Sequence, residues 1–211
     1  LLLEKCESLT AIEIDKDLIR FLKKAYGDRK NFNLIEKDIL LYDPKELVRV
    51  NKLIGNIPYN ISTPIIEWII DNKSSFDEIF LMLQKEFGNR CVAQPNTKSY
   101  GRLSIFVQCF FDVTVIREVD KSSFTPSPKV QSIFLKLIPK VSDMTPNSIL
   151  MKNLSTLTRE AFSKRRKLIT NSLKSFFTEE DLVNLGIERK SRPENLSVET
   201  YIKLAKSIQS G

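Results

Sequence analysis

The stretch Lys52-Leu53-Ile54-Gly55-Asn56-Ile57-Pro58-Tyr59-Asn60 joins a short apolar run to a polar turn that contains a proline. This pattern is typical of a buried strand that ends in a stiffened loop. The side-chain oxygen of Asn56 and a backbone carbonyl held by Pro58 can accept both N–H bonds of an exocyclic amine, and the ring of Tyr59 can stack on a planar base. The stretch predicts a site for an aminated nucleobase; an ordinary strand-to-helix turn is the alternative interpretation.

Such a site suits methylation of the amine. The lone pair of an aromatic amine is delocalised into the ring, so the nitrogen is a poor nucleophile. Two acceptors on its hydrogens favour a pyramidal nitrogen, and this stabilisation grows as positive charge develops during transfer. No side chain has to remove a proton first. The chain contains no histidine, which excludes imidazole bases, Ser-His couples and His-bound metals.

Composition narrows the class of protein. The 211 residues are 42% hydrophobic and 28% charged, which indicates a globular chain of one large domain or two unequal ones. No apolar run approaches the roughly 20 residues of a membrane span, and the first residues lack a secretory signal. Cys6, Cys91 and Cys109 are too widely spaced for a disulfide framework or zinc site. We expect a cytoplasmic monomer that binds no metal and no membrane.

Basic residues concentrate in one segment. The chain carries a net charge of +7, and between Lys152 and Lys174 seven cations accompany one acid, Glu160, for a local charge of +6. Four consecutive cations, Lys164, Arg165, Arg166 and Lys167, repel one another and would gain from phosphates. The segment predicts nucleic-acid binding; a solvated helix face is the alternative.

The first half of the chain alternates strand and helix patterns. Strands are predicted over residues 8–15, 33–37, 51–54 and 78–83, and helices over 16–25 and after a cap at Ser62 or Thr63, with Pro64 in the first turn. This alternation predicts an α/β fold with a mostly parallel, doubly wound sheet.

The pattern changes after Gln84. Two helices are predicted over 85–92 and 101–110, followed by strands over 112–119 and 131–138 that form an antiparallel hairpin at the sheet edge. Residues 139–146 have the composition of a linker, and the remainder is helical in period. We therefore predict a catalytic domain over residues 1–140 and a small helical, RNA-binding domain over residues 147–211.

Glu13, Asp38 and Asn56 lie at the ends of three successive predicted strands. Ligands of such sheets bind outside the carboxyl ends of the strands, where one acid holds ribose hydroxyls and a later one accepts from an adenine amine. The three residues together predict a crevice for a nucleoside cofactor. Exposed strand-end carboxylates are the alternative for Glu13 and Asp38 taken singly.

Eight segments carry a family resemblance over essentially the whole chain. In order, they are Ile12-Glu13-Ile14-Asp15, Glu36-Lys37-Asp38, Gly55 to Ser62, Gln84-Lys85-Glu86, Tyr100 to Ser104, Phe124 to Ser132, Ala161 to Lys167 and Arg192 to Glu199. Together they resemble the small-subunit ribosomal RNA adenine dimethyltransferases of the KsgA type. The resemblance implies a Rossmann-like class I methyltransferase sheet that uses S-adenosylmethionine. It also implies dimethylation of the N6 amines of two adjacent adenosines in a hairpin near the 3′ end of small-subunit RNA, with the immature small ribosomal subunit as partner.

The resemblance also implies roles for residues. Glu13 would bind the ribose of the cofactor and Asp38 its adenine, while Asn56 would lie between methyl donor and target amine. Tyr59 would stack on the flipped adenine, with Phe124 on the other face; a core aromatic is the alternative for Phe124. The candidates for phosphate contacts are Arg102, Lys129, Lys164, Arg165, Arg166 and Lys167. For Arg102, a surface cation or a structural ion pair is an equal alternative.

One departure concerns glycine. Enzymes of this kind hold the methionine end of the cofactor with a glycine-rich loop, yet no two of the six glycines lie in a Gly-X-Gly spacing. We expect the natural protein to carry a preceding segment of tens of residues with a strand and that loop, and we expect poor cofactor binding without it. Two other functions remain open: a resistance-type methyltransferase of large-subunit RNA, although Arg192 to Glu199 fits the small-subunit family better, and a catalytically silent ribosome-assembly factor.

Overall fold

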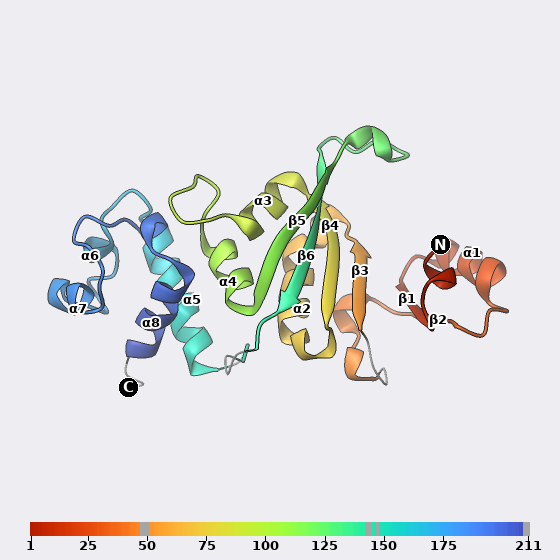
Figure 1. Ribbon diagram of the computed structural model, residues 1–211, viewed down its shortest axis with the longest axis horizontal. Helices are drawn as coiled ribbons and strands as arrows, with labels where there is room; N and C mark the ends of the chain where they lie inside the picture. The colour runs from red at the N-terminus through yellow and green to blue at the C-terminus, as the bar shows by residue number, and fades with distance from the viewer. Residues whose placement is uncertain (47–50, 142–144, 147, 209–211) are drawn as a thin grey trace. The chain divides into compact units, whose positions relative to one another are not determined.

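The computed structural model describes residues 1–46, 51–141, 145–146 and 148–208 (Figure 1). The chain forms two compact units, Leu1–Val48 and Arg49–Gly211, which we call the N-terminal and C-terminal units. Each unit contains its own sheet. The separation near residue 48 is a division that the sequence did not predict. A domain boundary at residues 140–147 stays a prediction, and part of that linker, residues 142–144, lies outside the described residues.

The N-terminal unit is a strand–helix–strand crossover. Strand β1 (Leu9–Glu13) pairs in parallel with β2 (Phe32–Glu36), and helix α1 (Lys16–Tyr26) connects them. The side chain of Asp15 caps α1 by accepting the N–H groups of Asp17 and Leu18 at 2.8 and 3.0 Å, and these bonds lower the pKa of its carboxyl. Short 3₁₀ turns occupy Leu2–Glu4, Ile39–Leu41 and Pro44–Glu46. The strand and helix predictions for this region are confirmed to within a few residues.

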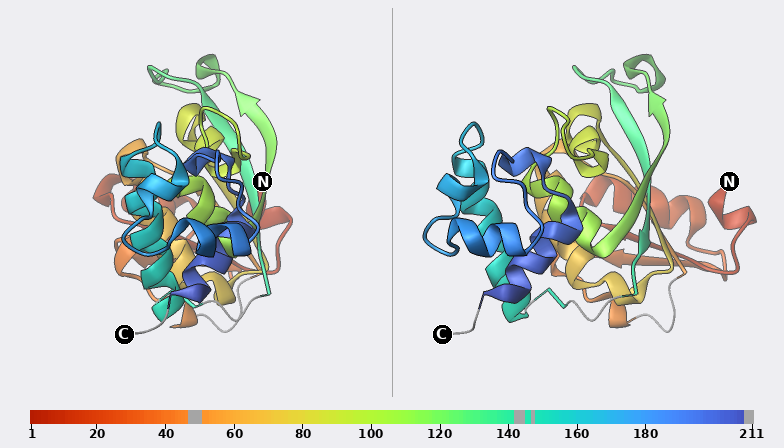
Figure 2. Two further views of the ribbon diagram at one scale, coloured as in Figure 1. Left: turned by 90° about the vertical axis from the view of Figure 1, so that its left-hand side faces the viewer. Right: turned by 60° about the vertical axis from the view of Figure 1, so that its left-hand side comes forward.

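The C-terminal unit contains a four-stranded sheet in the order β3-β4-β6-β5. Strands β3 (Lys52–Asn56) and β4 (Glu78–Gln84) are parallel, whereas β6 (Ser132–Pro139) runs antiparallel to both β4 and β5 (Phe111–Val119). The predicted antiparallel hairpin is therefore present, with β5 at the edge. Its connecting segment projects beyond the end of the sheet (Figures 1 and 2).

Alternation along β4 explains how the sheet is buried. Ile79, Leu81 and Leu83 are fully buried and alternate with half-exposed residues, as expected for a strand covered on one face by helices. Helix α2 (Ser62–Asp71) packs its isoleucines, Ile65 and Ile69 among them, into the same core. The predicted cap of α2 was wrong, because Ile61 occupies the cap position without a side-chain bond and Ser62 is already helical. Pro64 does lie in the first turn.

Helices α3 (Lys85–Val92) and α4 (Arg102–Phe110) occupy almost the predicted ranges. Gly88 of α3 approaches β6 so closely that a Cβ at this position would lie 2.2 Å from Cγ2 of Ile133. This contact holds α3 against the strand that begins at Ser132. Short 3₁₀ turns at Tyr59–Ile61, Lys73–Ser75 and Lys121–Ser123 complete this half of the unit.

The C-terminal helices pack against α4. Helices α5 (Ile149–Ser163) and α8 (Val198–Ser207) lie side by side and both contact α4, on its side away from the sheet (Figure 1). The ring of Phe162 bridges Tyr100 and Tyr201, with ring centroids at 6.4 and 6.0 Å. Helices α6 (Ile169–Ser172) and α7 (Glu179–Asn184) and the 3₁₀ turn Pro193–Asn195 complete this helical end. In the described part of the chain, no helix is long and apolar enough to span a bilayer.

Candidate active site and nucleic-acid interface

Asn56 lies at the carboxyl end of a parallel strand. It is the last residue of β3, opposite Met82 of β4, and the N–H of Ile57 donates to the carbonyl of Met82 at 3.1 Å. The pairing thus continues past Asn56, so this residue stands on a rigid element and not in the loop predicted from the sequence. Its side chain is exposed and makes no hydrogen bond to any residue that the structure describes. The amide is therefore available to a ligand.

The turn after Asn56 is tied down by three hydrogen bonds. The carbonyl of Pro58 accepts the N–H of Ile61 at 3.1 Å, and the carbonyl of Tyr59 accepts the hydroxyl of Ser62 at 3.0 Å. The hydroxyl of Tyr59 lies 2.8 Å from Oγ of Ser132. Ser132 is fully buried as the first residue of β6. The half-buried Tyr59 ring is thus fixed at its polar tip, which leaves a face for stacking.

Sequence reasoning missed Ser132. It is the last residue of the Phe124 to Ser132 segment, so the motif contained it, but no spacing rule links it to a tyrosine 73 positions earlier. The signal in the sequence was a hydroxyl at the start of a strand that is mostly apolar. Such a buried hydroxyl needs a hydrogen-bond partner.

Phe124 belongs to the projecting segment between β5 and β6 and is half-buried. Its N–H donates to the carbonyl of Lys121 at 3.3 Å, after a turn that Asp120 caps. The base of the hairpin is fixed by Lys85, whose ammonium donates to Glu118 at 2.8 Å and to Gln131 at 3.0 Å. Among the described residues, no ring contact joins Phe124 to Tyr59. Its role as the second stacking face stays a prediction.

Glu13 and Asp38 lie at the same end of the two-stranded sheet. The register pairs Glu13 with Glu36, and the N–H of Lys37 donates to the carbonyl of Glu13 at 3.0 Å. Oε1 of Glu13 accepts the N–H groups of Ile14 and Asp15, both at 2.8 Å. Oδ1 of Asp38 accepts the N–H of Leu40 at 2.9 Å. The two carboxylates are thus oriented by backbone bonds that each use one oxygen.

This arrangement fits a nucleoside ligand, because a carboxylate held through one oxygen still offers the other to ribose hydroxyls or an amine. The crevice predicted for Glu13, Asp38 and Asn56 stays a prediction, since Asn56 belongs to the C-terminal unit and the other two to the N-terminal unit. In the described residues, no group of cysteine, aspartate and glutamate side chains is arranged to hold a metal ion.

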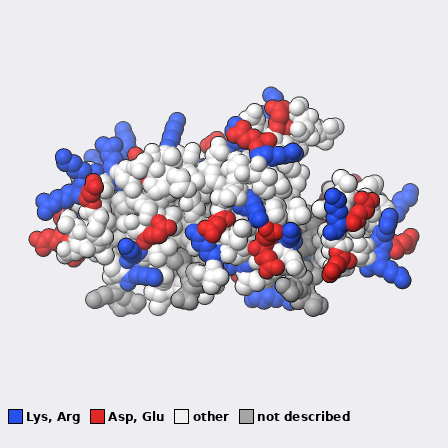
Figure 3. All heavy atoms as spheres, viewed as in Figure 1, with Lys and Arg blue, Asp and Glu red and all other residues white. Residues whose placement is uncertain are grey.

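Cations gather over the C-terminal helices (Figure 3). The turn between α5 and α6, residues 164–167, is closed by a hydrogen bond of 2.8 Å from the N–H of Lys167 to the carbonyl of Lys164. Lys164, Arg166 and Lys167 are exposed, as phosphate contacts require. Arg102, the first residue of α4, and Lys129 in the projecting segment are exposed as well.

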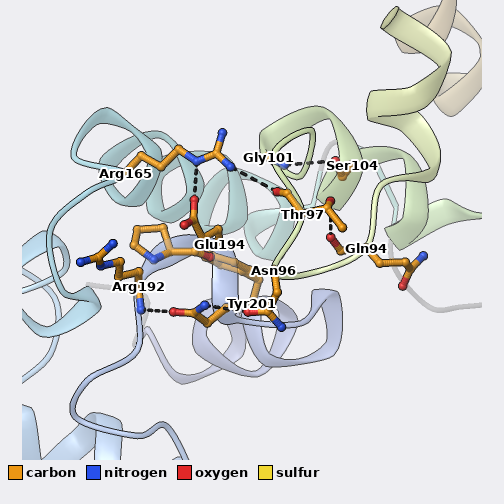
Figure 4. A network of polar contacts seen from close by, with 11 residues as sticks. Gln94, Asn96, Thr97, Gly101, Ser104, Arg165, Arg192, Glu194 and Tyr201 are labelled. Carbon is orange, nitrogen blue, oxygen red and sulfur yellow. Dashed lines mark hydrogen bonds and ion pairs between the residues drawn. The ribbon is translucent and has the colours of Figure 1, made fainter. Parts of the chain in front are cut away.

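Arg165 differs from its three neighbours. Its Nε forms an ion pair with Oε2 of Glu194, and its Nη2 donates to the carbonyl of Thr97 at 3.2 Å (Figure 4). The side chains of Arg165 and Glu194 are 37% and 28% exposed, so the pair is partly shielded from water. A phosphate contact by Arg165 stays a prediction, and the structure gives its guanidinium two partners within the protein.

Residues Arg192–Leu196 form what we call the C-terminal brace (Figure 4). The carbonyl of Glu194 accepts the N–H of Asn96 at 2.8 Å, and Nδ2 of Asn195 donates to Oδ1 of Asn96 at 2.7 Å. The buried hydroxyls of Tyr100 and Tyr201 donate to the carbonyls of Leu196 and Pro193, both at 2.9 Å. Burial raises the pKa of both phenols well above the ordinary value. The brace therefore ties the loop before α4 to α8.

The brace also reveals cations that sequence reasoning missed. Lys98, Lys190 and Arg192 are exposed. Arg165 of the basic turn, residues 164–167, donates to the carbonyl of Thr97, next to Lys98. The N–H of Ile169, the first residue of α6, donates at 2.8 Å to the carbonyl of Ser191, which lies between Lys190 and Arg192. Lys98 is isolated in the sequence, and Lys190 and Arg192 belong to the short stretch Arg189-Lys190-Ser191-Arg192, which is less conspicuous than the four consecutive cations at 164–167.

Comparison with known proteins agrees with the resemblance seen in the sequence. The model of the ribosomal RNA adenine dimethylase family matches residues 1–210. Over 207 residues, the chain is 37% identical to a ribosomal RNA small subunit methyltransferase A from Coxiella burnetii strain RSA 493, covering 97% of this chain and 80% of that protein.

Solved structures share the fold. A dimethyladenosine transferase from Plasmodium falciparum matches with a TM-score of 0.78 and 29% identity over 96% of this chain and 82% of its own. The 23S rRNA methyltransferase ErmE matches with a TM-score of 0.74 over 98% of this chain and 84% of its own, and at 21% identity this likeness shows the fold alone. The predicted Rossmann-like α/β methyltransferase fold is confirmed. The chain belongs to the ribosomal RNA adenine dimethylase family.

Proposed function

We propose that this protein dimethylates the N6 amines of two adjacent adenosines in a hairpin near the 3′ end of small-subunit ribosomal RNA. It acts in the cytoplasm on immature small ribosomal subunits, as a monomer, and S-adenosylmethionine is the methyl donor. The observation that carries the proposal is the exposed amide of Asn56 at the end of β3, beside the anchored ring of Tyr59, in a chain of this family.

Asn56 binds the target amine and prepares it for transfer. In the first transfer its Oδ1 and a backbone carbonyl held by Pro58 accept the two N6 hydrogens, and in the second transfer one of these acceptors takes the single hydrogen that remains. Both arrangements localise the nitrogen lone pair. S-adenosylmethionine supplies an electrophilic methyl group, whose bond to sulfur breaks as the bond to N6 forms. The same two acceptors stabilise the positive charge that develops on nitrogen, and the proton then leaves to water. Because acceptors do this work, no side chain needs to act as a base.

Tyr59 holds the adenine after it leaves the RNA stack. Flipping a base costs a few kcal/mol, and stacking on an aromatic ring returns about 1–3 kcal/mol per base. The hydrogen bond to Ser132 fixes the ring before the base arrives, so little entropy is lost on binding. Phe124 closes over the other face of the base from the projecting segment.

Glu13 and Asp38 bind the nucleoside part of the cofactor. Glu13 accepts ribose hydroxyls and Asp38 accepts from the adenine amine, each through the oxygen that its backbone bonds leave over. Phosphates of the RNA contact Arg102, Lys129, Lys164, Arg166 and Lys167, whose exposure supports this role.

The test is methyl transfer by the full-length protein with labelled S-adenosylmethionine, followed by mapping of the modified nucleotides. Immature small subunits and large subunits are offered in parallel. We expect label in two adjacent dimethyladenosines of the small-subunit RNA. Label confined to large-subunit RNA would overturn the substrate, and binding of small subunits without any transfer would favour a silent assembly factor.

A further inference from the structure

Hydrogen bonds join three segments of the chain: the loop before α4, the basic turn at residues 164–167, and the C-terminal brace with the residues just before it. The loop before α4 joins the C-terminal brace through Asn96, and the turn joins that loop through Arg165 and Thr97. The start of α6 joins the segment before the brace through Ile169 and Ser191. Each of the three segments carries exposed cations: Lys98, then Lys164, Arg166 and Lys167, and finally Lys190 and Arg192.

Glu194 lies at the centre of these connections. Its carboxylate pairs with Arg165 of the turn, and its carbonyl accepts the N–H of Asn96 from the loop (Figure 4). A residue that joins the brace to both other segments is therefore an acid within a basic surface. An acid near an RNA site ordinarily weakens binding, because it repels phosphates.

We propose that the Arg165–Glu194 ion pair is a positioning pair, which holds the three segments together as one phosphate-binding face for the RNA backbone. This inference rests on the proposed function, since it needs an RNA substrate. Arg165 serves the face from within, while the neighbouring cations contact phosphates. Glu194 thereby strengthens RNA binding despite its charge.

Two physical arguments support the positioning role. Four adjacent cations repel one another, and pairing Arg165 with a carboxylate removes one of them from that repulsion and directs its side chain inward. The guanidinium of Arg165 also bonds to two different segments, Glu194 of the brace and Thr97 of the loop before α4. These bonds order the turn before RNA binds. Cations on an ordered turn lose less conformational entropy when they contact phosphates.

Glu194→Gln separates two explanations of Glu194, because an effect of charge alone and a positioning role predict opposite changes in the RNA dissociation constant. Loss of an acid from a basic face should tighten RNA binding if Glu194 acts only by charge. Loss of the positioning pair should raise the dissociation constant for a small-subunit RNA hairpin roughly 3- to 10-fold at 0.1 M salt, about the effect of one phosphate contact. The salt dependence should also become flatter, by about one unit of slope.

Glu188→Gln is the matched control. Glu188 is an exposed acid on the same helical end, and it forms no ion pair with the described residues. Its replacement removes the same charge and should leave RNA binding equal or slightly tighter. The double variant Arg165→Gln with Glu194→Gln tests the two residues as a unit. Because both single changes break the same pair, the dissociation constant of the double variant should lie within about 3-fold of that of Glu194→Gln.

RNA binding is measured at 4 °C, and the melting temperature of each variant is measured separately. The salt slope guards against partial unfolding, since an inactive fraction alters the apparent affinity but not the slope. Glu194→Gln binding as tightly as Glu188→Gln, with an unchanged slope, would overturn the positioning role and leave the proposed function intact. Failure of the wild-type protein to bind small-subunit RNA would instead remove the proposed function.

Discussion

The turn after β3 and the C-terminal brace use similar residues in opposite ways. Asn-Ile-Pro-Tyr at 56–59 and Arg-Pro-Glu-Asn at 192–195 are both polar turns with a proline. In the brace, Glu194 and Asn195 bond to other segments of the chain, and two buried tyrosines bond to its carbonyls. At the start of the turn, on the last residue of β3, the Asn56 amide has no partner among the described residues. Polar groups that satisfy one another hold a structure together, whereas a polar group left open on a rigid strand end serves a ligand.

The largest effect on methyl transfer should come from replacing Asn56 with alanine, and Asn195→Ala in the brace is the variant to compare with it. Asn56→Ala removes an acceptor that acts in the transition state, so methyl transfer to immature small subunits should slow by about 10- to 1000-fold. Its melting temperature should not change. Asn195→Ala should show the reverse, a lower melting temperature with near-normal transfer measured well below it. Equal behaviour of the two variants would remove the distinction between the regions.

Tyr201→Phe should destabilise the brace. The change keeps the ring but leaves the buried carbonyl of Pro193 without its donor, which should lower the free energy of unfolding by about 1–3 kcal/mol. Urea denaturation measures this. Tyr26→Phe is the control, because Tyr26 is 38% exposed and its hydroxyl can bond to water. A brace that tolerated Tyr201→Phe as well as this control would not depend on its internal hydrogen bonds.

Ser132→Ala tests whether the hydrogen bond between the hydroxyls of Ser132 and Tyr59 holds the ring in place for catalysis. Loss of the bond to Tyr59 should slow methyl transfer roughly 2- to 10-fold, the equivalent of about 0.5–1.5 kcal/mol. The RNA dissociation constant should rise by no more than about the same factor, because the ring must then be ordered when the base binds. Tyr59→Phe should cause a similar loss, and the double variant should be no slower than either single one, because both remove the same bond. Additive losses would show that the two hydroxyls act separately.

The smallest effect is expected for the buried cysteines of the core, which a thiol reagent should barely label in the native protein. Burial raises the pKa of the Cys91 and Cys109 thiols to about 12, so almost no thiolate forms at pH 8. We expect a thiol reagent to label the half-buried Cys6 in the native protein and all three cysteines after unfolding. Rapid labelling of Cys109 in the native state would show that the packing of α4 is looser than described.

Local patterns in the sequence predicted the elements well. Helix α3 occupies the predicted residues, and each end of β5 and β6 lies within one residue of its predicted position. These elements could be predicted because apolar periodicity and the change of pattern at Gln84 are local signals. The same signals placed Asn56 at a strand end. They ended that strand at Ile54, since Gly55 and Asn56 are poor strand formers, whereas pairing with β4 extends it.

Long-range partners could not be predicted. Tyr59 and Ser132 are 73 positions apart, and Arg165 and Glu194 are 29 apart. A charge run looks the same whether its members contact phosphates or one of them forms an ion pair within the fold. Only the tertiary structure separates Arg165 from Lys164, Arg166 and Lys167.

The most direct test of the account is the rate of the chemical step itself. Single-turnover methyl transfer by Asn56→Ala is measured at saturating RNA and saturating S-adenosylmethionine, so that neither binding step contributes. The account predicts a rate at least about 10-fold below that of the wild type, with an RNA dissociation constant that is unchanged. A single-turnover rate equal to that of the wild type would contradict the assignment of Asn56 as the acceptor of the adenine amine.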